Sequence, residues 1–373
     1  MPLIATAPAH RVILGLMTFG TDESTGARVT DAGDFNKILD LFQSRGYNEV
    51  DTARVYVGGQ QEAFTREANW KDRGLTLATK IKYPSEHGAN VHDKVIESLD
   101  LSLKELGTDA VDILYLHAAV RPLFPHLCLL NYIGVVAEDV TQDRGTPFAD
   151  TLSAIDKLHK AGKFVRFGIS NFTAFEVAEI VLTCKYNNWV RPTVYQGMYN
   201  AITRNIEPEL VPACRRYGLD IVVYNPIAGG LFSGKIKSTD MVPAEGRFSD
   251  AAHSGKMYRN RYFRDSTFRA LQIIEAAVEK SGLTMIETAL RWVVHHSALK
   301  VVDGNDGIII GVSNINQLDD NLTNIEKGPL PEEVVKALDE AWAVSKADSV
   351  NYWHMDVKYG YDTREALFGP GAR

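Results

Sequence analysis

The chain has 373 residues, of which 45% are hydrophobic and 23% charged, and it carries a formal net charge of −7. These values are typical of a globular protein, and a negative charge without any Lys/Arg-rich run argues against binding to nucleic acid. The cysteines Cys128, Cys184 and Cys214 are too few for a disulfide framework and lack metal-site spacing. We therefore expect a reducing compartment and no metal site.

The sequence contains no segment that we expect to enter a membrane. The longest mainly apolar run, residues 127–137, is too short to span a bilayer, which takes roughly 20 residues. His10 and Arg11 interrupt the mildly apolar start, and no cleavage-like segment follows. We expect a cytoplasmic protein.

Short apolar runs with β propensity alternate with helical patterns along almost the whole chain, as in parallel strands that helices cover. The expected strands are residues 12–14, 49–51, 75–80, 111–117, 164–170, 193–198, 220–225 and 307–311. The expected helices are residues 35–44, 93–106, 151–160, 176–186, 207–217, 268–280, 285–296, 317–324 and 332–344.

Eight strands separated by helices, with no linker, predict one α/β domain, a (β/α)8 TIM barrel with long loops at its C-terminal face. We expect a single domain, residues 1–373, with its core at about 11–352 and a C-terminal tail at 353–373. The long loops are an insertion at 120–142 and a glycine-bearing segment at 226–266. In such barrels the chemistry lies at the carboxyl ends of the strands. The side chains expected to meet there are Asp51, Lys80, His117, Ser170, Asn171, Gln196, Asn225 and Ser313.

Four of these strand ends carry a candidate proton-transfer site. Asp51 ends a short apolar run in the stretch NEVDTARVY, residues 48–56, and Tyr56 follows on the next turn. Lys80 and His117 end the next two strands. Taken singly, these residues could be a helix cap, a packed ring, a snorkelling lysine and a satisfied core histidine.

Together the four residue types have a joint chemical logic. A tyrosine hydroxyl, with an ordinary pKa of about 10, is a poor acid near neutral pH, and a nearby ammonium should lower that pKa. Lys80 would do this for Tyr56, Asp51 would hold Lys80, and neutral His117 would donate a hydrogen bond to a substrate carbonyl. Such an assembly can protonate an oxygen while hydride arrives at the adjacent carbon.

The order Asp51, Tyr56, Lys80, His117 at successive strand ends resembles the catalytic tetrad of the aldo-keto reductases. Further blocks resemble the aflatoxin B1-aldehyde reductase subfamily, namely GISNF at 168–172, PTVYQGMYN at 192–200, YNPIAGGLFSGK at 224–235, MYRNRY at 257–262 and GVSNINQL at 311–318. The resemblance covers roughly residues 11–352, apart from one insertion. It implies a reductase of aldehydes or ketones that uses NADPH, acts in detoxification or secondary metabolism, and has Tyr56 as its proton donor.

The resemblance also implies which residues hold the cofactor. Ser170, Asn171 and Gln196 would hold the nicotinamide carboxamide, although a buried Ser-Asn pair could instead be a helix cap. Tyr199 would stack on the nicotinamide, with core packing as the alternative. The pyrophosphate loop would use Asn225, Pro226, Ala228, Gly229, Gly230, Leu231, Gly234 and Lys235. The adenosine end would use Ser313, Gln317 and Asn321, at the start of a helix whose N–H groups suit phosphate.

One departure from the family pattern bears on the choice between NADP and NAD. Many aldo-keto reductases bind the 2′-phosphate with a Lys and an Arg in the last motif, where this chain has Gly311 and Gln317. Arg247 in the long loop is our candidate for that charge, and a solvated surface arginine is the alternative. NADP remains the expected cofactor, because the subfamily also lacks the basic pair and uses NADPH.

The resemblance assigns substrate contacts to Tyr258 and Arg261 as well as His117, and it implies a homodimer. His354 stands where the subfamily has an arginine for substrate carboxylates, which argues against a preference for acidic aldehydes.

Residues 120–142 are the one stretch that the family pattern does not predict. They are apolar and aperiodic, and their removal would leave a loop of ordinary length after His117. The segment is either a lid over the substrate mouth or an intron retained as coding sequence. Every valine codon begins with GT and a glutamine codon can end in AG, so Val120 and Gln142 could mark splice sites, and we favour the second hypothesis.

Two other functions remain open at this point. Lys80 at a barrel strand end could form a Schiff base with a carbonyl substrate, as in an aldolase. The chain could also be a nucleotide-sensing regulatory protein with little turnover, similar to the potassium-channel β subunits.

Overall fold

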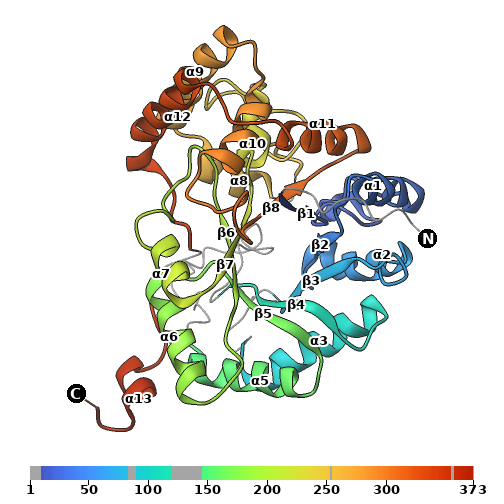
Figure 1. Cartoon of the computed structure of the whole chain (residues 1–373). Helices are drawn as coiled ribbons and strands as arrows, with labels where there is room; N and C mark the ends of the chain where they lie inside the picture. The colour runs from blue at the N-terminus through green and yellow to red at the C-terminus, as the bar shows by residue number, and fades with distance from the viewer. Residues whose placement is uncertain (1–9, 83–89, 119–144, 253, 354–356, 373) are drawn as a thin grey trace, which may run out of the picture.

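Parallel strands close into a barrel at the centre of the molecule. The computed structural model describes residues 10–82, 90–118, 145–252, 254–353 and 357–372. Its strands are β1 (Arg11–Gly15), β2 (Glu49–Asp51), β3 (Thr76–Lys80), β4 (Val111–Leu116), β5 (Phe164–Ser170), β6 (Val194–Met198), β7 (Asp220–Tyr224) and β8 (Gly307–Gly311). Each strand pairs in parallel with its neighbours in sequence, and β1 pairs with β8, which closes the ring (Figure 1). The predicted (β/α)8 barrel is confirmed.

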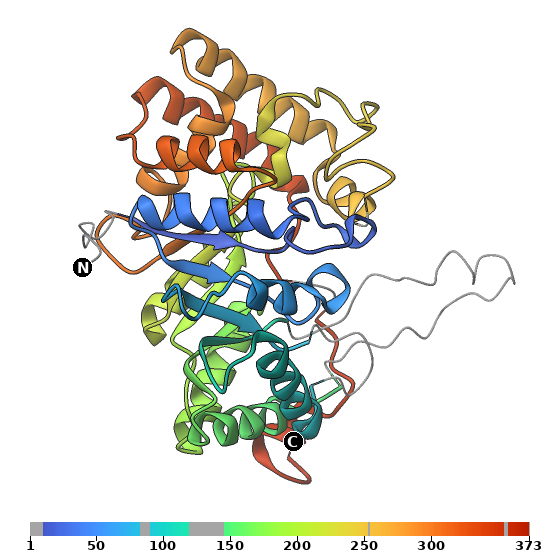
Figure 2. The ribbon, with the colours of Figure 1, turned by 90° about the vertical axis from the view of Figure 1, so that its right-hand side faces the viewer.

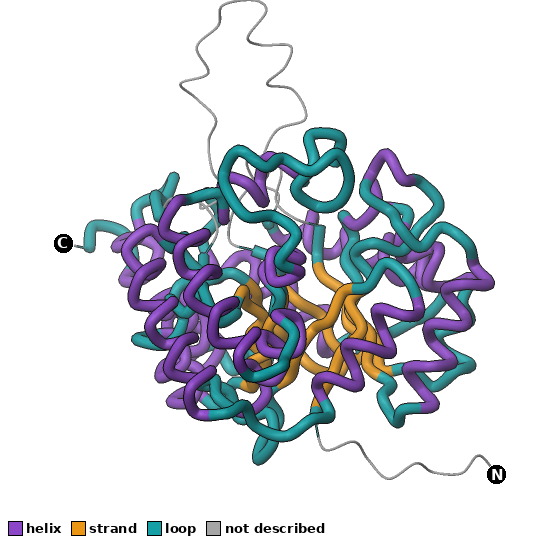
Figure 3. Tube along the Cα trace, turned by 90° about the horizontal axis from the view of Figure 1, so that it is seen from above, coloured by secondary structure: helices purple, strands orange, loops and turns teal. Residues whose placement is uncertain are grey.

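The helices surround this ring on all sides (Figures 1, 2 and 3). They are α1 (Ala32–Ser44), α2 (Gln61–Glu67), α3 (His92–Leu106), α5 (Phe148–Lys160), α6 (Ala174–Tyr186), α7 (Leu210–Tyr217), α8 (Gly255–Tyr262), α9 (Asp265–Lys280), α10 (Met285–His295), α11 (Ile315–Ile325), α12 (Glu332–Ser345) and α13 (Thr363–Phe368). Short 3-10 helices are η1 (Glu23–Thr25), η2 (Tyr56–Gly59), η3 (Ala228–Ser233) and η4 (Lys346–Asp348).

Every helix expected from the sequence is present, and several begin earlier than expected because side chains cap them. Thr173 caps α6 and forms a reciprocal capping box with Glu176, so this helix begins at Ala174. Asp31 caps α1 in the same manner, through the backbone N–H of Asp34.

Helices α2, α8 and α13 were not expected. The segment 226–266, predicted to be one long loop, contains η3 and α8. Besides Gly255, helix α8 buries only Tyr258 and Tyr262, which lie one turn apart. Its sequence therefore lacks the repeated apolar positions by which an amphipathic helix is predicted. The tail also forms α13, a helix without buried residues.

Alternate strand residues fill the barrel interior, and the others pack against the helices. The interior cluster consists of Ile13, Ala78, Ile113, Tyr115, Val194, Val222 and Ile309. The ring of Tyr115 lies so close to Gly168 that a Cβ there would approach ring atoms to 2.4 Å. Glycine at this position therefore lets β4 and β5 pack around a large interior ring.

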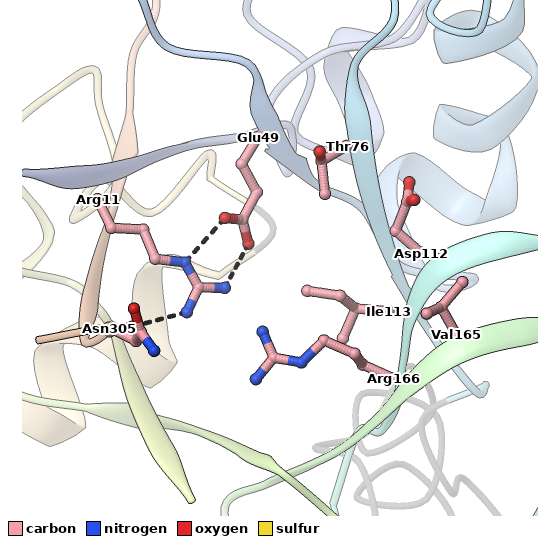
Figure 4. A pocket seen from close by; sticks show the side chains of 8 residues that line it. All are labelled: Arg11, Glu49, Thr76, Asp112, Ile113, Val165, Arg166 and Asn305. Carbon is pink, nitrogen blue, oxygen red and sulfur yellow. Dashed lines mark hydrogen bonds and ion pairs between the residues drawn. The ribbon is translucent and has the colours of Figure 1, made fainter. Parts of the chain in front are cut away.

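A hollow of about 350 Å³ lies at the opposite end of the barrel from the expected chemistry (Figure 4). Arg11 enters it and donates to both carboxylate oxygens of Glu49, at 2.8 and 2.7 Å, and to the Asn305 carbonyl at 2.8 Å. Arg166, on another wall, donates to Asp220 at 2.8 Å. The remaining wall residues are Thr76, Asp112, Ile113 and Val165. Because the charges pair with one another at the start of the strands, we assign this end to stability.

The same end contains a buried carboxylate with several donors, Asp306. It accepts from Arg215, from the Ile221 amide at 2.7 Å and from the Lys300 amide at 2.7 Å. Asp306→Ala should lower the free energy of unfolding by about 3–5 kcal/mol, because it leaves the partly buried Arg215 guanidinium and two backbone amides without their acceptor. Urea denaturation measures this loss.

The control for this variant is Glu332→Ala, which breaks an exposed i,i+4 pair with Lys336. That loss should be at most about 1 kcal/mol. Equal losses in the two variants would contradict a structural role for the buried carboxylate.

Candidate active site

The carboxyl ends of β2 and β3 bring Asp51, Tyr56 and Lys80 together. The Lys80 ammonium donates to Asp51, to the Thr52 carbonyl at 2.8 Å and to the Tyr56 hydroxyl at 3.1 Å. Its side chain is fully buried. Each ammonium proton thus has an acceptor, and the Tyr56 oxygen accepts from Lys80 while keeping its own proton to donate elsewhere.

Burial controls the pKa of these three groups. It raises the pKa of the Asp51 carboxyl and lowers that of the Lys80 ammonium, and each is partly offset by the charge of the other. Burial also raises the pKa of Tyr56 well above its ordinary value, and the negative charge of Asp51 adds to this. The pKa of Tyr56 is therefore raised and not lowered as expected, because burial of the phenol outweighs the effect of the nearby ammonium. The phenol stays protonated at neutral pH, as a proton donor must.

His117 lies at the same mouth, directly after β4. Its ring meets the Tyr56 ring edge-on, with the centroids 6.0 Å apart. Its backbone carbonyl accepts from the Asn171 side chain at 2.9 Å. The four strand-end residues predicted to form one site therefore do converge.

The ends of β5, β6 and β7 supply a second group beside the first. Asn171 donates to the Ser170 hydroxyl at 3.0 Å and accepts from the Tyr224 hydroxyl at 2.8 Å. Gln196 donates to Asp51 at 2.8 Å, so it holds the carboxylate that holds Lys80. Gln196 thereby connects the candidate carboxamide residues to the candidate proton-transfer group.

Tyr199 does not lie where a ring could stack on a nicotinamide. It is completely buried, its ring packs against Trp292 with centroids 5.3 Å apart, and its hydroxyl donates to Glu207 at 2.6 Å. That hydroxyl also accepts from the Ala298 amide at 3.1 Å. The structure thus supports the alternative of core packing.

Tyr224 is the residue that sequence reasoning missed. It ends β7 next to Asn225, is half-buried, and touches Asn171 through its hydroxyl. Tyr224 is the last residue of β7 and Tyr199 directly follows β6, so position at a strand end does not separate the two tyrosines in the sequence.

The loop that follows β7 turns through several left-handed residues. Ala228, Gly229 and Gly230 have φ values of 51°, 70° and 100°, and Gly234 has 70°. A Cβ on Gly229 would approach the Tyr258 ring to 2.6 Å, whereas one on Gly230 would meet nothing within 4 Å. The loop is therefore packed on one side and open on the other, as a backbone cradle for a ligand requires.

Other members of the predicted loop set anchor it. Asn225 donates to the Tyr262 hydroxyl at 2.5 Å, and Ala228 and Leu231 are fully buried. Pro226 lies between them in sequence, and Lys235 is exposed at the far end of the loop.

The predicted adenosine residues lie at the start of α11. Asn314 caps the helix by accepting from the Gln317 amide at 3.0 Å. The Gln317 side chain in turn accepts from the Ser313 amide at 2.9 Å. Asn321 is buried on the next turn. Ser313 and Gln317 are therefore bound to each other in this arrangement.

Two arginines, Arg247 and Arg261, flank Tyr258. The guanidiniums of Arg247 and Arg261 lie 5.2 and 5.3 Å from the Tyr258 ring centroid, and Arg247 donates to its hydroxyl at 2.9 Å. Burial alone would raise the pKa of Tyr258, but the two arginines outweigh it and lower that pKa. The pKa of Arg28 is lowered by burial and then by the positive charge of Arg247.

Two predictions fall on residues that the structure does not describe. His354 and the insertion 120–142 lie outside the described ranges, so both stay predictions.

A closed barrel with ionisable side chains at the carboxyl ends of its strands has the form of a (β/α)8 enzyme. The sequence pattern of the Aldo/keto reductase family matches residues 11–343. The chain belongs to the aldo/keto reductase family, and the resemblance found in the sequence is confirmed.

Relatives are similar over most of their length. An aldo-keto reductase of Pseudocercospora fijiensis is 39% identical over 320 residues, 85% of this chain and 100% of that protein. Aflatoxin B1 aldehyde reductase member 2 of Rattus norvegicus is 38% identical over 365 residues, 94% of this chain and 92% of that protein. The aldo-keto reductase pigE of Monascus ruber is 36% identical over 342 residues, 88% of this chain and 92% of that protein.

These findings identify an oxidoreductase of the kind that reduces aldehydes and ketones, in a family that generally uses nicotinamide cofactors. In the part of the chain that the structure describes, no helix is long and apolar enough to cross a membrane.

The placement of Tyr199 can be tested by removing its hydroxyl. Tyr199→Phe should lower the free energy of unfolding by about 1.5–3 kcal/mol, because the lost hydrogen bond goes to a carboxylate. The dissociation constant of NADPH should not change. Urea denaturation and quenching of protein fluorescence by NADPH measure the two quantities.

Tyr186→Phe is the matched control, since Tyr186 is 80% exposed. It should change neither quantity. A weaker NADPH complex with unchanged stability in Tyr199→Phe would show that the hydroxyl acts on the cofactor and would contradict the core-packing role.

Proposed function

We propose that the chain is an NADPH-dependent reductase of aldehydes or ketones in which Tyr56 donates the proton. The observation that carries this proposal is the hydrogen bond of 3.1 Å from the buried Lys80 ammonium to the Tyr56 hydroxyl. A phenol whose oxygen already accepts from a cation releases its proton to a carbonyl oxygen more readily, because the developing phenolate is stabilised. Asp51 and Gln196 keep the cation in place.

The residues at the mouth fit a nicotinamide nucleotide. Ser170 and Asn171 form an amide-and-hydroxyl group beside Tyr56, and Gly230 borders open space in a left-handed turn. When bound, the cofactor would supply the hydride. Tyr224, half-buried against Asn171, offers the ring that Tyr199 cannot.

The roles of this chain's own residues follow from their positions. His117, edge-on to Tyr56, would orient the carbonyl oxygen toward the phenol. Tyr56 would give its proton to that oxygen, and Lys80 would stabilise the resulting phenolate at once. Because the raised pKa keeps Tyr56 protonated, the donor is ready at neutral pH.

We propose aldehydes as the substrates, in detoxification or secondary metabolism, supported by relatives whose name is aflatoxin B1 aldehyde reductase. The Schiff-base alternative has less support. An attacking amine needs a free lone pair, whereas the Lys80 nitrogen is fully buried and donates to three acceptors. A nucleotide-sensing regulatory protein would bind the cofactor in the same way, so only a measurement of turnover distinguishes it from the proposed reductase.

Tyr56→Phe tests the proton donor. Steady-state reduction of a simple aromatic aldehyde by NADPH should fall by about a hundred- to ten-thousand-fold, the usual contribution of a general acid. NADPH binding should stay nearly intact, since the ring remains. Unchanged turnover would contradict the assignment of Tyr56 as the proton donor.

The two rival functions give other outcomes in the same assay. Borohydride trapping of the substrate on Lys80 would support the aldolase. Cofactor binding by the wild-type chain without turnover of any aldehyde in a panel would support the regulatory protein.

Arg247→Met tests the choice of NADP over NAD. If Arg247 attracts the 2′-phosphate, the dissociation constant of NADPH should rise by about tenfold or more, from one lost charge-assisted contact. The dissociation constant of NADH should not change. Fluorescence titration measures both constants.

Lys256→Met, which removes an exposed charge from α8, controls for net charge. It should leave both constants unchanged. Equal weakening of NADPH and NADH by Arg247→Met would show that the arginine does not recognise the phosphate.

A further inference from the structure

We propose that Arg54 and Glu62 are positioning residues that hold the Tyr56 turn against β3. Together they form a partly buried clamp that sets the distance from the Tyr56 hydroxyl to the Lys80 ammonium. Neither residue touches that hydroxyl. This inference rests on the proposed role of Tyr56 as the proton donor.

Arg54 spans the turn that carries Tyr56. Its guanidinium donates to the Gly59 carbonyl and to the Glu62 carboxylate, on either side of the start of α2. Its backbone amide donates to the carbonyl of Lys80 at 3.2 Å. One residue therefore ties the turn to itself and to the strand end that bears the catalytic ammonium.

The turn has an unfavourable backbone that needs such support. Val57 has φ 48° and ψ 54°, and Gly58 and Gly59 also have positive φ. A left-handed β-branched residue is strained and persists only when its surroundings fix it. A Cβ on Gly59 would lie 2.8 Å from the Arg54 guanidinium, so glycine is needed there for the arginine to reach its carbonyl.

Glu62 completes the link to β3. Its side chain is fully buried, and its second carboxylate oxygen accepts from the Thr79 hydroxyl at 2.6 Å. Thr79 directly precedes Lys80 and is itself buried. The turn is thus attached to β3 at two points, through the Lys80 carbonyl and through the Thr79 side chain.

This geometry places the clamp between the two partners of the hydrogen bond that carries the proposed chemistry. Tyr56 lies between Arg54 and Glu62 in sequence, and Lys80 follows Thr79. Loosening the clamp should let the phenol drift from the ammonium without removing any group that binds NADPH. A displacement of about 1 Å in a reacting group can cost about a hundredfold in rate.

The test uses Glu62→Gln, Arg54→Met and the double variant in the full chain. The value of kcat for an aromatic aldehyde should fall by at least about tenfold in each single variant. The dissociation constant of NADPH should not change. Because the two residues act as one unit, the double variant should lose no more kcat than the less active of the two single variants.

Glu287 and Arg291 on α10 provide a matched control pair, with side chains 10% and 11% exposed and 2.7 Å apart. Glu287→Gln and Arg291→Met should lower the melting temperature and leave kcat unchanged. If Glu62→Gln and Arg54→Met behave like this control, with lower melting temperature and wild-type kcat, the clamp is only structural and the inference is overturned.

Arg54→Lys covers the case in which the other variants do not fold. Lysine keeps a cation for Glu62 but lacks the guanidinium fork that also reaches the Gly59 carbonyl. Reduced kcat at a wild-type melting temperature supports the clamp, and wild-type kcat overturns it.

Tyr56→Phe run in parallel separates the two ideas. If it retains turnover, the proposed function fails. If it loses turnover while both clamp variants keep theirs, only the clamp fails.

Discussion

The structure depends on one buried cation, the ammonium of Lys80. Burying an unpaired ion costs several kcal/mol, so its surroundings must supply acceptors at fixed places. They do so with Asp51, the Thr52 carbonyl and Tyr56, all from β2 and the turn after it. Gln196 extends this group to β6. The electrostatic demand of one side chain thereby aligns strands from both halves of the barrel.

The strands and the four-residue site could be predicted because strand ends are visible in the sequence and all point to one edge of a parallel barrel. The direction of the Tyr56 pKa shift could not be predicted, since it depends first on how deeply the phenol is buried and then on the charge of Asp51. The assignment of the stacking ring to Tyr199 failed for a related reason. Both tyrosines follow apolar runs, and only the packing of Tyr199 on Trp292 shows which ring faces inward.

The two ends of the barrel use charge in different ways. At the amino ends of the strands, Arg11 with Glu49 and Arg215 with Asp306 neutralise each other. At the carboxyl ends, the guanidiniums of Arg247 and Arg261 both lie against Tyr258, 5.2 and 5.3 Å from its ring centroid. Paired charges stabilise a fold, whereas like charges held together favour an anionic ligand. This contrast explains why the hollow between the amino ends is a weaker candidate for function than the opposite mouth.

The pairing of β1 with β8 has a consequence for how the chain folds during synthesis. The first strand leaves the ribosome long before the last, so one edge of the growing sheet stays open until residues 307–311 emerge. An open edge of apolar strands invites pairing with other chains. Late closure of the barrel is therefore expected from this topology, because the pairing of residues 11–15 with 307–311 joins distant parts of the sequence.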